Sequence, residues 1–91
     1  NFKKMLDDLI GTRGAYILDE SSNILGKVPT SELLGTLGSL QSGVHAVVLD
    51  GNVTKDIMSV AERAHVKYLV ARNSDVESDR VQVITNQDLV H

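Results

Sequence analysis

The sequence predicts an α/β domain with a mostly parallel sheet, flanking helices and an N-terminal β-hairpin. The first observation is a set of short aliphatic runs of strand length. The second is that segments of helical periodicity alternate with several of these runs, which is typical of strand–helix–strand units with parallel strands. The third is composition. Of the 91 residues, 42% are hydrophobic and only 3% are aromatic, which indicates one domain spanning 1–91 with a modest aliphatic core.

The N-terminal half begins with a helix and a hairpin. Apolar residues recur at helical spacing across 2–10. The run 14–19 is typical of a strand, a Ser-Ser-Asn turn follows at 21–23, and 24–28 returns as a second strand. Pro29 ends that strand and begins a second helix, whose leucines recur at helical spacing.

The C-terminal half is expected to complete the sheet. The segment 44–49 is apolar on both faces, as a central parallel strand requires. The clearest helix covers 54–65, and a further buried strand follows at 67–71. The polar connection 72–80 is too short for a helical crossover, so the last strand, 81–84, is expected to lie antiparallel or at an edge.

The periodicity also predicts which side chains form the core and where the chain's last helix starts. Thr85-Asn86-Gln87-Asp88 has the pattern of a capped helix start. The expected core residues are Ile17, Leu33, Leu37, Val47, Leu49, Ile57, Ala61, Leu69 and Val83.

Charge and aromatic content bear on nucleic-acid binding. The net charge is −3, and nine Lys and Arg are scattered along the chain, whereas a domain that holds nucleic acid by itself is usually basic. The near-absence of aromatic residues removes the usual stacking platform. We therefore expect at most weak nucleic-acid binding and mainly protein contacts. Candidate nucleic-acid contacts, if folding brings them together, are Arg13, Lys27, Lys67 and Arg72.

Other composition features limit the class of protein. Cysteine is absent, which excludes disulfides and thiolate metal sites. The apolar runs are far shorter than a bilayer span, and no signal-peptide pattern is present, so a cytoplasmic location without a membrane partner is expected. The chain begins with Asn, which suggests a piece of a longer protein.

Asp50-Gly51-Asn52 is the first candidate site, because it follows the central strand. Ligands of open α/β sheets bind outside the carboxyl ends of the strands, where Asp50 is able to reach a metal, a ribose or an amine. The competing interpretation is a strand-to-helix turn that caps the helix starting at residue 54, and turn chemistry favours it.

The remaining motifs favour structural interpretations over functional ones. Asp75, Glu77 and Asp79 alternate as Mg²⁺ ligands do, but their polar loop suits hydrated chain better. The segment 11–14, Gly-Thr-Arg-Gly, lacks the Lys-Ser/Thr of a phosphate loop and precedes a strand, so it reads as a connecting loop with Arg13 exposed. The three histidines show no ligand spacing: His45, His65 and His91. No catalytic or metal-binding residue is therefore predicted.

Four segments together resemble the archaeal DnaG-type DNA primases, in the region that follows the Toprim domain. They are Gly-Thr-Arg-Gly-Ala-Tyr-Ile-Leu-Asp at 11–19, Leu-Gly-Lys-Val-Pro at 25–29, Val-Val-Leu-Asp-Gly at 47–51 and Val-Lys-Tyr-Leu-Val at 66–70. They occur in the right order and span most of the chain. The resemblance rests on their combination, since no single motif is as specific as a set of zinc ligands.

The resemblance implies an accessory domain of a larger machine. The family resembles bacterial primases, nucleotidyltransferases that make RNA primers for DNA replication with Mg²⁺ held by Toprim acidic residues. Its archaeal members are also associated with the RNA exosome and with binding of A-rich RNA. Asp50 ends a strand without the paired acidic residues of a Toprim site, so the resemblance carries no catalytic residue onto this chain. The implied partners are the other parent domains, exosome subunits, and DNA or RNA through the parent.

Two rival functions stay open. A signalling receiver would use Asp19-Glu20 and Asp50 as acidic residues, but no Lys follows Lys67 and a strand instead of a helix follows the acidic pair. A dimerisation or interaction module agrees with the low basic charge and with the primase resemblance alike.

Overall fold

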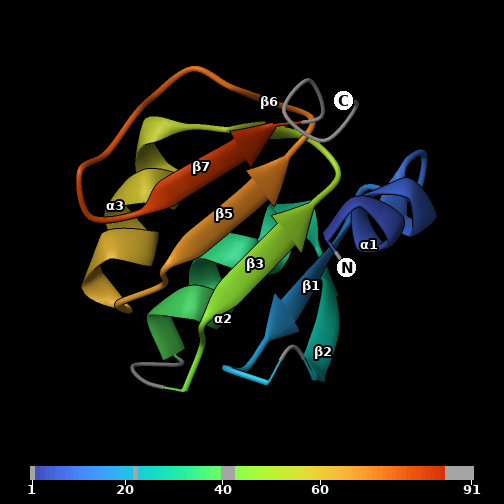
Figure 1. Cartoon of the computed structure of the whole chain (residues 1–91), viewed down its shortest axis with the longest axis horizontal. Coiled ribbons are helices and arrows are strands. Elements are labelled where there is room, and N and C mark those ends of the chain that lie inside the picture. The colour runs from blue at the N-terminus through green and yellow to red at the C-terminus, as the bar shows by residue number, and fades with distance from the viewer. Residues whose placement is uncertain (1, 22, 40–42, 86–91) are drawn as a thin grey trace.

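The computed structural model describes residues 2–21, 23–39 and 43–85, and Figure 1 shows their arrangement. The expected helix start at 85–88 falls largely outside these residues, as does His91, and Thr85 itself ends a strand. In chain order the elements are α1 (Phe2–Leu9), β1 (Gly14–Leu18), β2 (Ile24–Pro29), the 3₁₀ turn η1 (Thr30–Glu32), α2 (Leu33–Ser39), β3 (Ala46–Leu49), β4 (Asn52–Val53), α3 (Lys55–Arg63), β5 (Tyr68–Ala71), β6 (Asn73–Ser74) and β7 (Gln82–Thr85).

Five strands form one mixed sheet in the order β2-β1-β3-β5-β7. β1 is antiparallel to both of its neighbours, while β3, β5 and β7 are mutually parallel, so β2 and those three strands run in one direction. The predicted fold class and hairpin are confirmed. The last strand, β7, was expected to lie antiparallel or at an edge. It lies at the sheet edge and pairs parallel with β5. The other expectation, an antiparallel strand, is wrong because the connection returns along the α3 side of the sheet without forming a helix.

Part of that return is itself paired. β6 lies beside β4 in a separate two-stranded parallel sheet, with Asn52 opposite Asn73 and Val53 opposite Ser74. Val76 then packs against the main core, and the Ser78 hydroxyl donates a 2.7 Å hydrogen bond to Glu62 Oε2 on α3. The loop predicted to be simply hydrated is therefore attached to α3 and to the core at several points.

Two apolar layers sandwich the sheet. α2 and α3 cover one face and α1 covers part of the other (Figure 1). Alternation along the strands sends Val47 and Leu69 toward α2 and α3, and Val48 and Val70 toward α1. All but one of the predicted core residues are buried. The exception is Val83, which is half-buried because β7 is an edge strand.

Side-chain hydrogen bonds define the β1–β2 hairpin turn and the start of α3. The Asp19 carboxylate accepts from the backbone N–H groups of Ser21 and Asn23, each at 2.9 Å, and so closes the β1–β2 hairpin. α3 begins with Thr54, whose hydroxyl accepts from the Ile57 N–H at 3.3 Å. Two residues after α3 ends at Arg63, His65 has a left-handed backbone with φ 59°.

Candidate functional site

Asp50 lies directly after β3, the central strand of the sheet, and it is 7% exposed. Among the described residues it is the one buried residue with a charged side chain. Its position is the carboxyl end of a central strand, where open α/β sheets bind ligands. The contacts of its carboxylate therefore decide what this end of the sheet can do.

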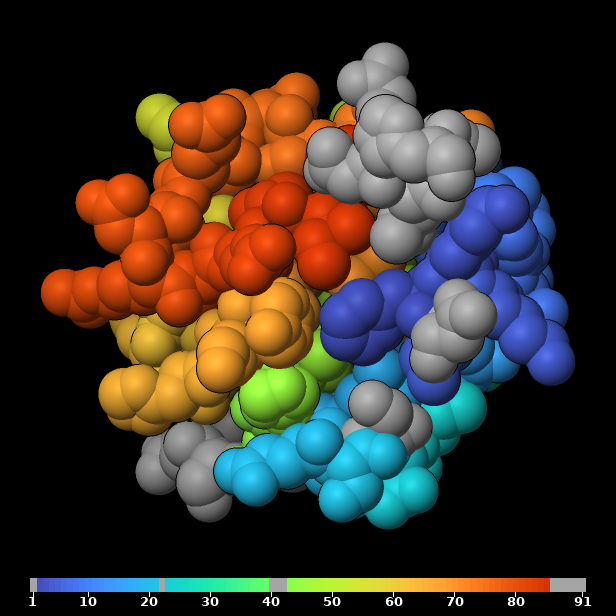
Figure 2. All heavy atoms as spheres, in the orientation of Figure 1, coloured from blue at the N-terminus to red at the C-terminus, as the bar shows by residue number. Residues whose placement is uncertain are grey.

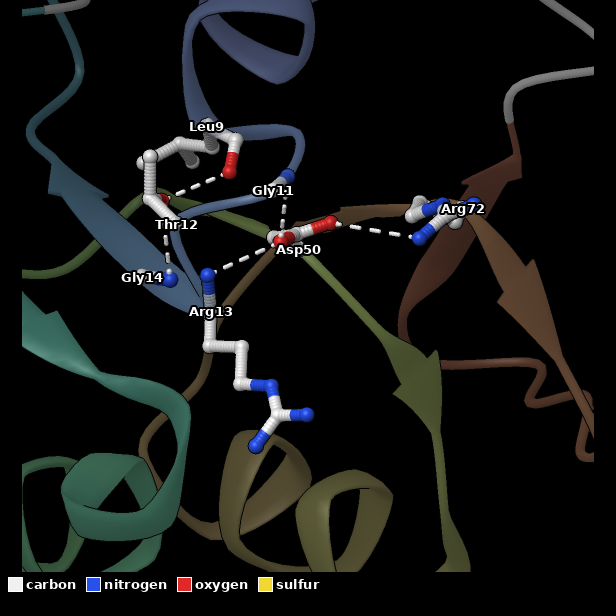
Figure 3. A network of polar contacts seen from close by, with 7 residues as sticks. All are labelled: Leu9, Gly11, Thr12, Arg13, Gly14, Asp50 and Arg72. Carbon is white, nitrogen blue, oxygen red and sulfur yellow. Dashed lines mark hydrogen bonds and ion pairs between the residues drawn. The ribbon is translucent and has the colours of Figure 1, made fainter.

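The carboxylate of Asp50 binds the loop between α1 and β1, shown in Figure 3. Its Oδ2 accepts hydrogen bonds from the backbone N–H groups of Gly11, at 3.0 Å, and Arg13, at 2.9 Å. Both donors have positive φ, 87° for Gly11 and 55° for Arg13. A turn of this kind points neighbouring backbone N–H groups toward a single anion. Here the anion is the Asp50 carboxylate of the same chain.

Thr12 holds this loop in shape from within. Its hydroxyl donates a 2.6 Å hydrogen bond to the carbonyl of Leu9 at the end of α1, and accepts a 3.1 Å hydrogen bond from the N–H of Gly14 (Figure 3). The Asp50 backbone N–H in turn donates to the Gly14 carbonyl at 2.9 Å. Asp50 thus joins the start of β1 to the end of β3 through both its side chain and its backbone.

The second carboxylate oxygen faces Arg72. Oδ1 of Asp50 lies 3.7 Å from Nη1 of Arg72, whose side chain is 53% exposed. Oδ1 accepts no hydrogen bond within the part of the chain that the structure describes. The ion pair is therefore long and partly screened by solvent, and the two short backbone hydrogen bonds on Oδ2 are the stronger contacts.

Asp50-Gly51-Asn52 has two interpretations, a ligand site and a turn that caps α3. The carboxylate points to the α1–β1 loop and not to α3, so the expected capping role is wrong: the cap of α3 is Thr54, which is nearer in sequence and has the required geometry. Gly51 accepts a 3.0 Å hydrogen bond from the Arg72 N–H, and the exposed Asn52 opens β4. A ligand at Asp50 stays a prediction.

The four candidate nucleic-acid contacts divide into two pairs. Arg13 and Arg72 lie at the Asp50 end, and the Arg13 guanidinium points away from that carboxylate (Figure 3). Lys27 lies on β2 and Lys67 directly precedes β5, and each has its ammonium within 6 Å of the centre of a tyrosine ring. The structure thus provides no single patch of four residues.

The remaining sequence motifs show no metal-like grouping. Asp75, Glu77 and Asp79 are all exposed. Within residues 2–21, 23–39 and 43–85, no group of three or more His, Cys, Asp or Glu side chains is arranged to hold a metal ion. In the same ranges no helix is long and apolar enough to span a bilayer.

The grouping of the aromatic side chains was not predicted from the sequence. The chain has only two Tyr and one Phe, and all three lie on the α1 side of the sheet: Phe2, Tyr16 and Tyr68. The rings of Phe2 and Tyr68 are 5.8 Å apart, and His45 meets Tyr68 edge-on at 5.4 Å. Alternation along each strand predicts which residues share a face within that strand. Placing Tyr16 and Tyr68 on the same face of the sheet also requires the pairing register between strands.

Comparison with known proteins gives a consistent result. No family model matches the chain. A protein of Thermofilum pendens named DNA primase DnaG is 37% identical over 65 residues, covering 71% of this chain and 15% of the relative. The protein of that name from Methanothermobacter thermautotrophicus is 35% identical over 75 residues, covering 81% and 20%. That from Thermococcus gammatolerans is 30% identical over 76 residues, covering 82% and 17%.

This chain is similar to a region of the DnaG-type primases. The family resemblance stated from the sequence is thereby confirmed, while its placement after the Toprim domain stays a prediction. The chain spans only 15% to 20% of the length of these three relatives. Two of the four resembling segments meet at Asp50: 11–19 contains its hydrogen-bond donors, and 47–51 contains Asp50 itself. This DnaG-like region therefore includes the contact that joins the α1–β1 loop to the sheet.

Proposed function

We propose that this chain is a non-catalytic accessory region of a DnaG-type primase and acts in DNA replication through protein contacts. Its partners would be the other domains of the parent and, as the family resemblance implies, exosome subunits. Primer synthesis, and the Mg²⁺ that it requires, would belong to the parent. The similarity to proteins named DNA primase DnaG supports the family part of this proposal.

The observation that carries the protein-contact part is the edge strand β2. Among the described strands it pairs on one side only, with β1. Two large apolar side chains at its start are more than half exposed, Ile24 at 52% and Leu25 at 54%. An open strand edge with exposed apolar residues is a template for a strand or loop of another polypeptide. β2 is therefore the proposed contact surface.

The distribution of acidic residues supports the non-catalytic part. Two-metal chemistry needs several carboxylates converging on neighbouring ions. The Asp50 carboxylate instead accepts backbone hydrogen bonds, and the acidic residues of the 72–80 loop are exposed. The expected result is that the purified chain makes no primers. Primer synthesis that is lost in Asp50→Ala would contradict this.

The contact surface can be tested by mixing the chain with the rest of its parent protein, supplied separately, and measuring complex formation by size exclusion and calorimetry. Leu25→Glu should weaken the complex at least about tenfold, because it places a charge in an apolar contact. Leu34→Glu is the matched control: Leu34 is 37% exposed, but it lies on α2. Unchanged affinity of Leu25→Glu would refute β2 as the contact surface.

The receiver alternative finds little support. Phosphoryl transfer to Asp50 needs an accessible carboxylate, but its side chain is 3% exposed and already bonded to Gly11 and Arg13. Acetyl phosphate with Mg²⁺ should leave the mass of the chain unchanged. A stable adduct on Asp50 would favour the receiver. The dimerisation alternative is separated by sizing the chain alone, where a dimer abolished by Leu25→Glu would show that β2 pairs with a second copy.

A further inference from the structure

A hollow of about 510 Å³ lies where α3 ends and where the chain enters β5 and β7. It is next to β7, the edge of the sheet opposite to β2. A second hollow, of about 320 Å³, shares Lys67, Arg80 and Val81 with the first. We call the two together the α3–β7 groove. The residues that line the first hollow are Glu62, His65, Val66, Lys67, Arg80 and Val81.

The 72–80 loop forms one border of this groove. Figure 2 shows the end of the loop, in deep orange, projecting at the left of the view beside the start of β5, in lighter orange. Ser78 fixes that border: its hydroxyl accepts from the backbone N–H groups of Arg80, at 3.0 Å, and Val81, at 3.3 Å. The same hydroxyl donates to Glu62 Oε2 on α3 at 2.7 Å. Hydrogen bonds therefore hold the backbone of Arg80 beside the end of α3.

The two cations of the groove have no anionic partner in the described part of the chain. Within residues 2–21, 23–39 and 43–85, no carboxylate oxygen lies within 4 Å of the charged nitrogen atoms of Lys67 or Arg80. The acidic residue that lines the first hollow, Glu62, is hydrogen-bonded to Ser78 instead. The Lys67 ammonium lies 5.8 Å from the centre of the Tyr68 ring, an exposed contact that a carboxylate can displace. An anionic group in the groove would complete this arrangement.

His65 provides an independent observation. Its φ of 59° lies in the left-handed region, which is more favourable for Gly than for a residue with a Cβ. The imidazole is nevertheless present there, lines the first hollow and is exposed. Its ring nitrogens make no hydrogen bond in the part of the chain that the structure describes. A side chain held in an unfavourable backbone conformation beside a hollow indicates a binding role.

We infer that the α3–β7 groove binds an acidic segment of another protein, with a carboxylate held between Lys67 and Arg80. The Arg80 guanidinium presents paired donors that match a carboxylate, and the His65 imidazole supplies a further polar contact. Val66 and Val81 form an apolar floor for the side chain next to that carboxylate.

The charges of the groove favour a peptide over a nucleic acid. Glu62 lines the first hollow and Asp79 the second, so the closely spaced phosphates of a nucleic acid would meet repulsion. A peptide can place a carboxylate at one position and a neutral residue at the next. Among the described residues that line the two hollows, none is aromatic, so the groove offers no ring on which a base could stack.

This inference goes beyond the proposed function, because the groove lies at the other edge of the sheet and needs no contact at β2. NMR titration of the 91-residue chain with a short peptide of alternating Glu and Leu tests it. The peptide should shift amide signals at His65, Lys67 and Arg80, and its counterpart of alternating Gln and Leu should shift them far less. Leu25→Glu on β2 should bind the Glu peptide as the native chain does, so failure of the β2 surface and failure of the groove are distinguishable.

Variants distinguish the groove from general charge effects. Lys67→Gln and Arg80→Gln should each weaken binding of the Glu peptide about two- to fivefold, as expected for exposed ion pairs. Lys55→Gln is the matched control, since it removes a positive charge from the exposed start of α3, at the other end of that helix. These side chains are exposed, so their variants keep the fold.

His65→Gly separates binding from stability. It removes the imidazole and relieves the left-handed backbone, so the peptide should bind about twofold more weakly while the melting temperature rises. Unchanged affinity together with higher stability would refute a binding role of His65.

Four results would overturn the proposal. Two are an absence of signal shifts at millimolar Glu peptide and equal binding of the Gln peptide. A third is an equal loss of affinity in Arg80→Gln and Lys55→Gln, which would indicate unspecific attraction. The fourth is tighter binding of a short oligonucleotide than of the Glu peptide at the same signals, which would assign the groove to phosphate groups instead.

Discussion

Asp50 accepts a 2.9 Å hydrogen bond from the backbone N–H of Arg13, 37 positions earlier in the chain. The Arg13 backbone is left-handed, and its N–H points to the carboxylate together with that of Gly11. A buried carboxylate needs such donors, and a loop with two converging N–H groups needs an acceptor. The contact therefore satisfies both partners and joins the first strand to the central strand.

Removing this carboxylate should destabilise the domain. Asp50→Ala leaves two loop N–H groups without their acceptor, and we expect the free energy of unfolding to fall by about 1–3 kcal/mol. Arg72→Gln should cost about 1 kcal/mol or less, because the Arg72 side chain is half exposed and its nitrogen is 3.7 Å from Oδ1. Urea denaturation measures both. Equal losses in the two variants would mean that the ion pair carries the stability instead.

Replacing His65 by Gly should stabilise the domain. α3 ends in a Schellman motif, with Val66 N–H bonded to Ala61 O at 3.0 Å and His65 N–H bonded to Glu62 O at 3.2 Å. His65 itself has φ 59°, a conformation that costs a residue with a Cβ about 1 kcal/mol relative to Gly. His65→Gly should therefore raise the melting temperature by about 4–8 °C. His65→Ala keeps the Cβ, and a similar rise in that variant would contradict the backbone explanation.

Asp19 gives the stability a dependence on acid pH. The hydrogen bond from the Asn23 backbone N–H, foremost among several contacts, holds the pKa of Asp19 below its usual value. Because the folded pKa is the lower one, the ionised group stabilises the fold at pH values above its unfolded pKa. That contribution is lost as the pH falls below about 4 and through the folded pKa.

Asp19→Asn should therefore destabilise the hairpin at neutral pH, and the difference from the native chain should shrink on acidification. Denaturation midpoints across the acid range provide the measurement. Glu20→Gln is the matched control, because it removes a neighbouring charge and leaves the hydrogen bonds to Asp19 in place. A difference for Asp19→Asn that stays constant from neutral to strongly acid pH would contradict the assignment.

The sequence was sufficient where the determining interactions are local. Continuous apolar runs predicted the strands around Val47 and Leu69, and the period of 3.6 predicted the helix containing Ile57, because burial imposes those patterns on contiguous residues. The partners of Asp50 could not be predicted, because its donors are distant in sequence and belong to a loop whose shape depends on Thr12.

The grouping of the aromatic residues shows the same limit. Three aromatic residues in the whole chain argued against a stacking surface, and composition alone cannot report that all of them lie on one side of the sheet. That outcome depends on the antiparallel β1–β3 register and the parallel β3–β5 register together. A one-residue slip in either pairing would send Tyr16 or Tyr68 to the opposite face.

The core should be most sensitive at the centre of the sheet. Leu69 is fully buried on β5 between β3 and β7, so Leu69→Ala leaves a cavity and should cost about 2–5 kcal/mol. Val83 is the neighbouring residue on the edge strand β7 and is half-buried, so Val83→Ala removes fewer atoms from a site where solvent can enter, and it should cost about 1 kcal/mol. Denaturant midpoints at constant m-value compare the two. Equal losses would contradict the difference in burial between Leu69 and Val83.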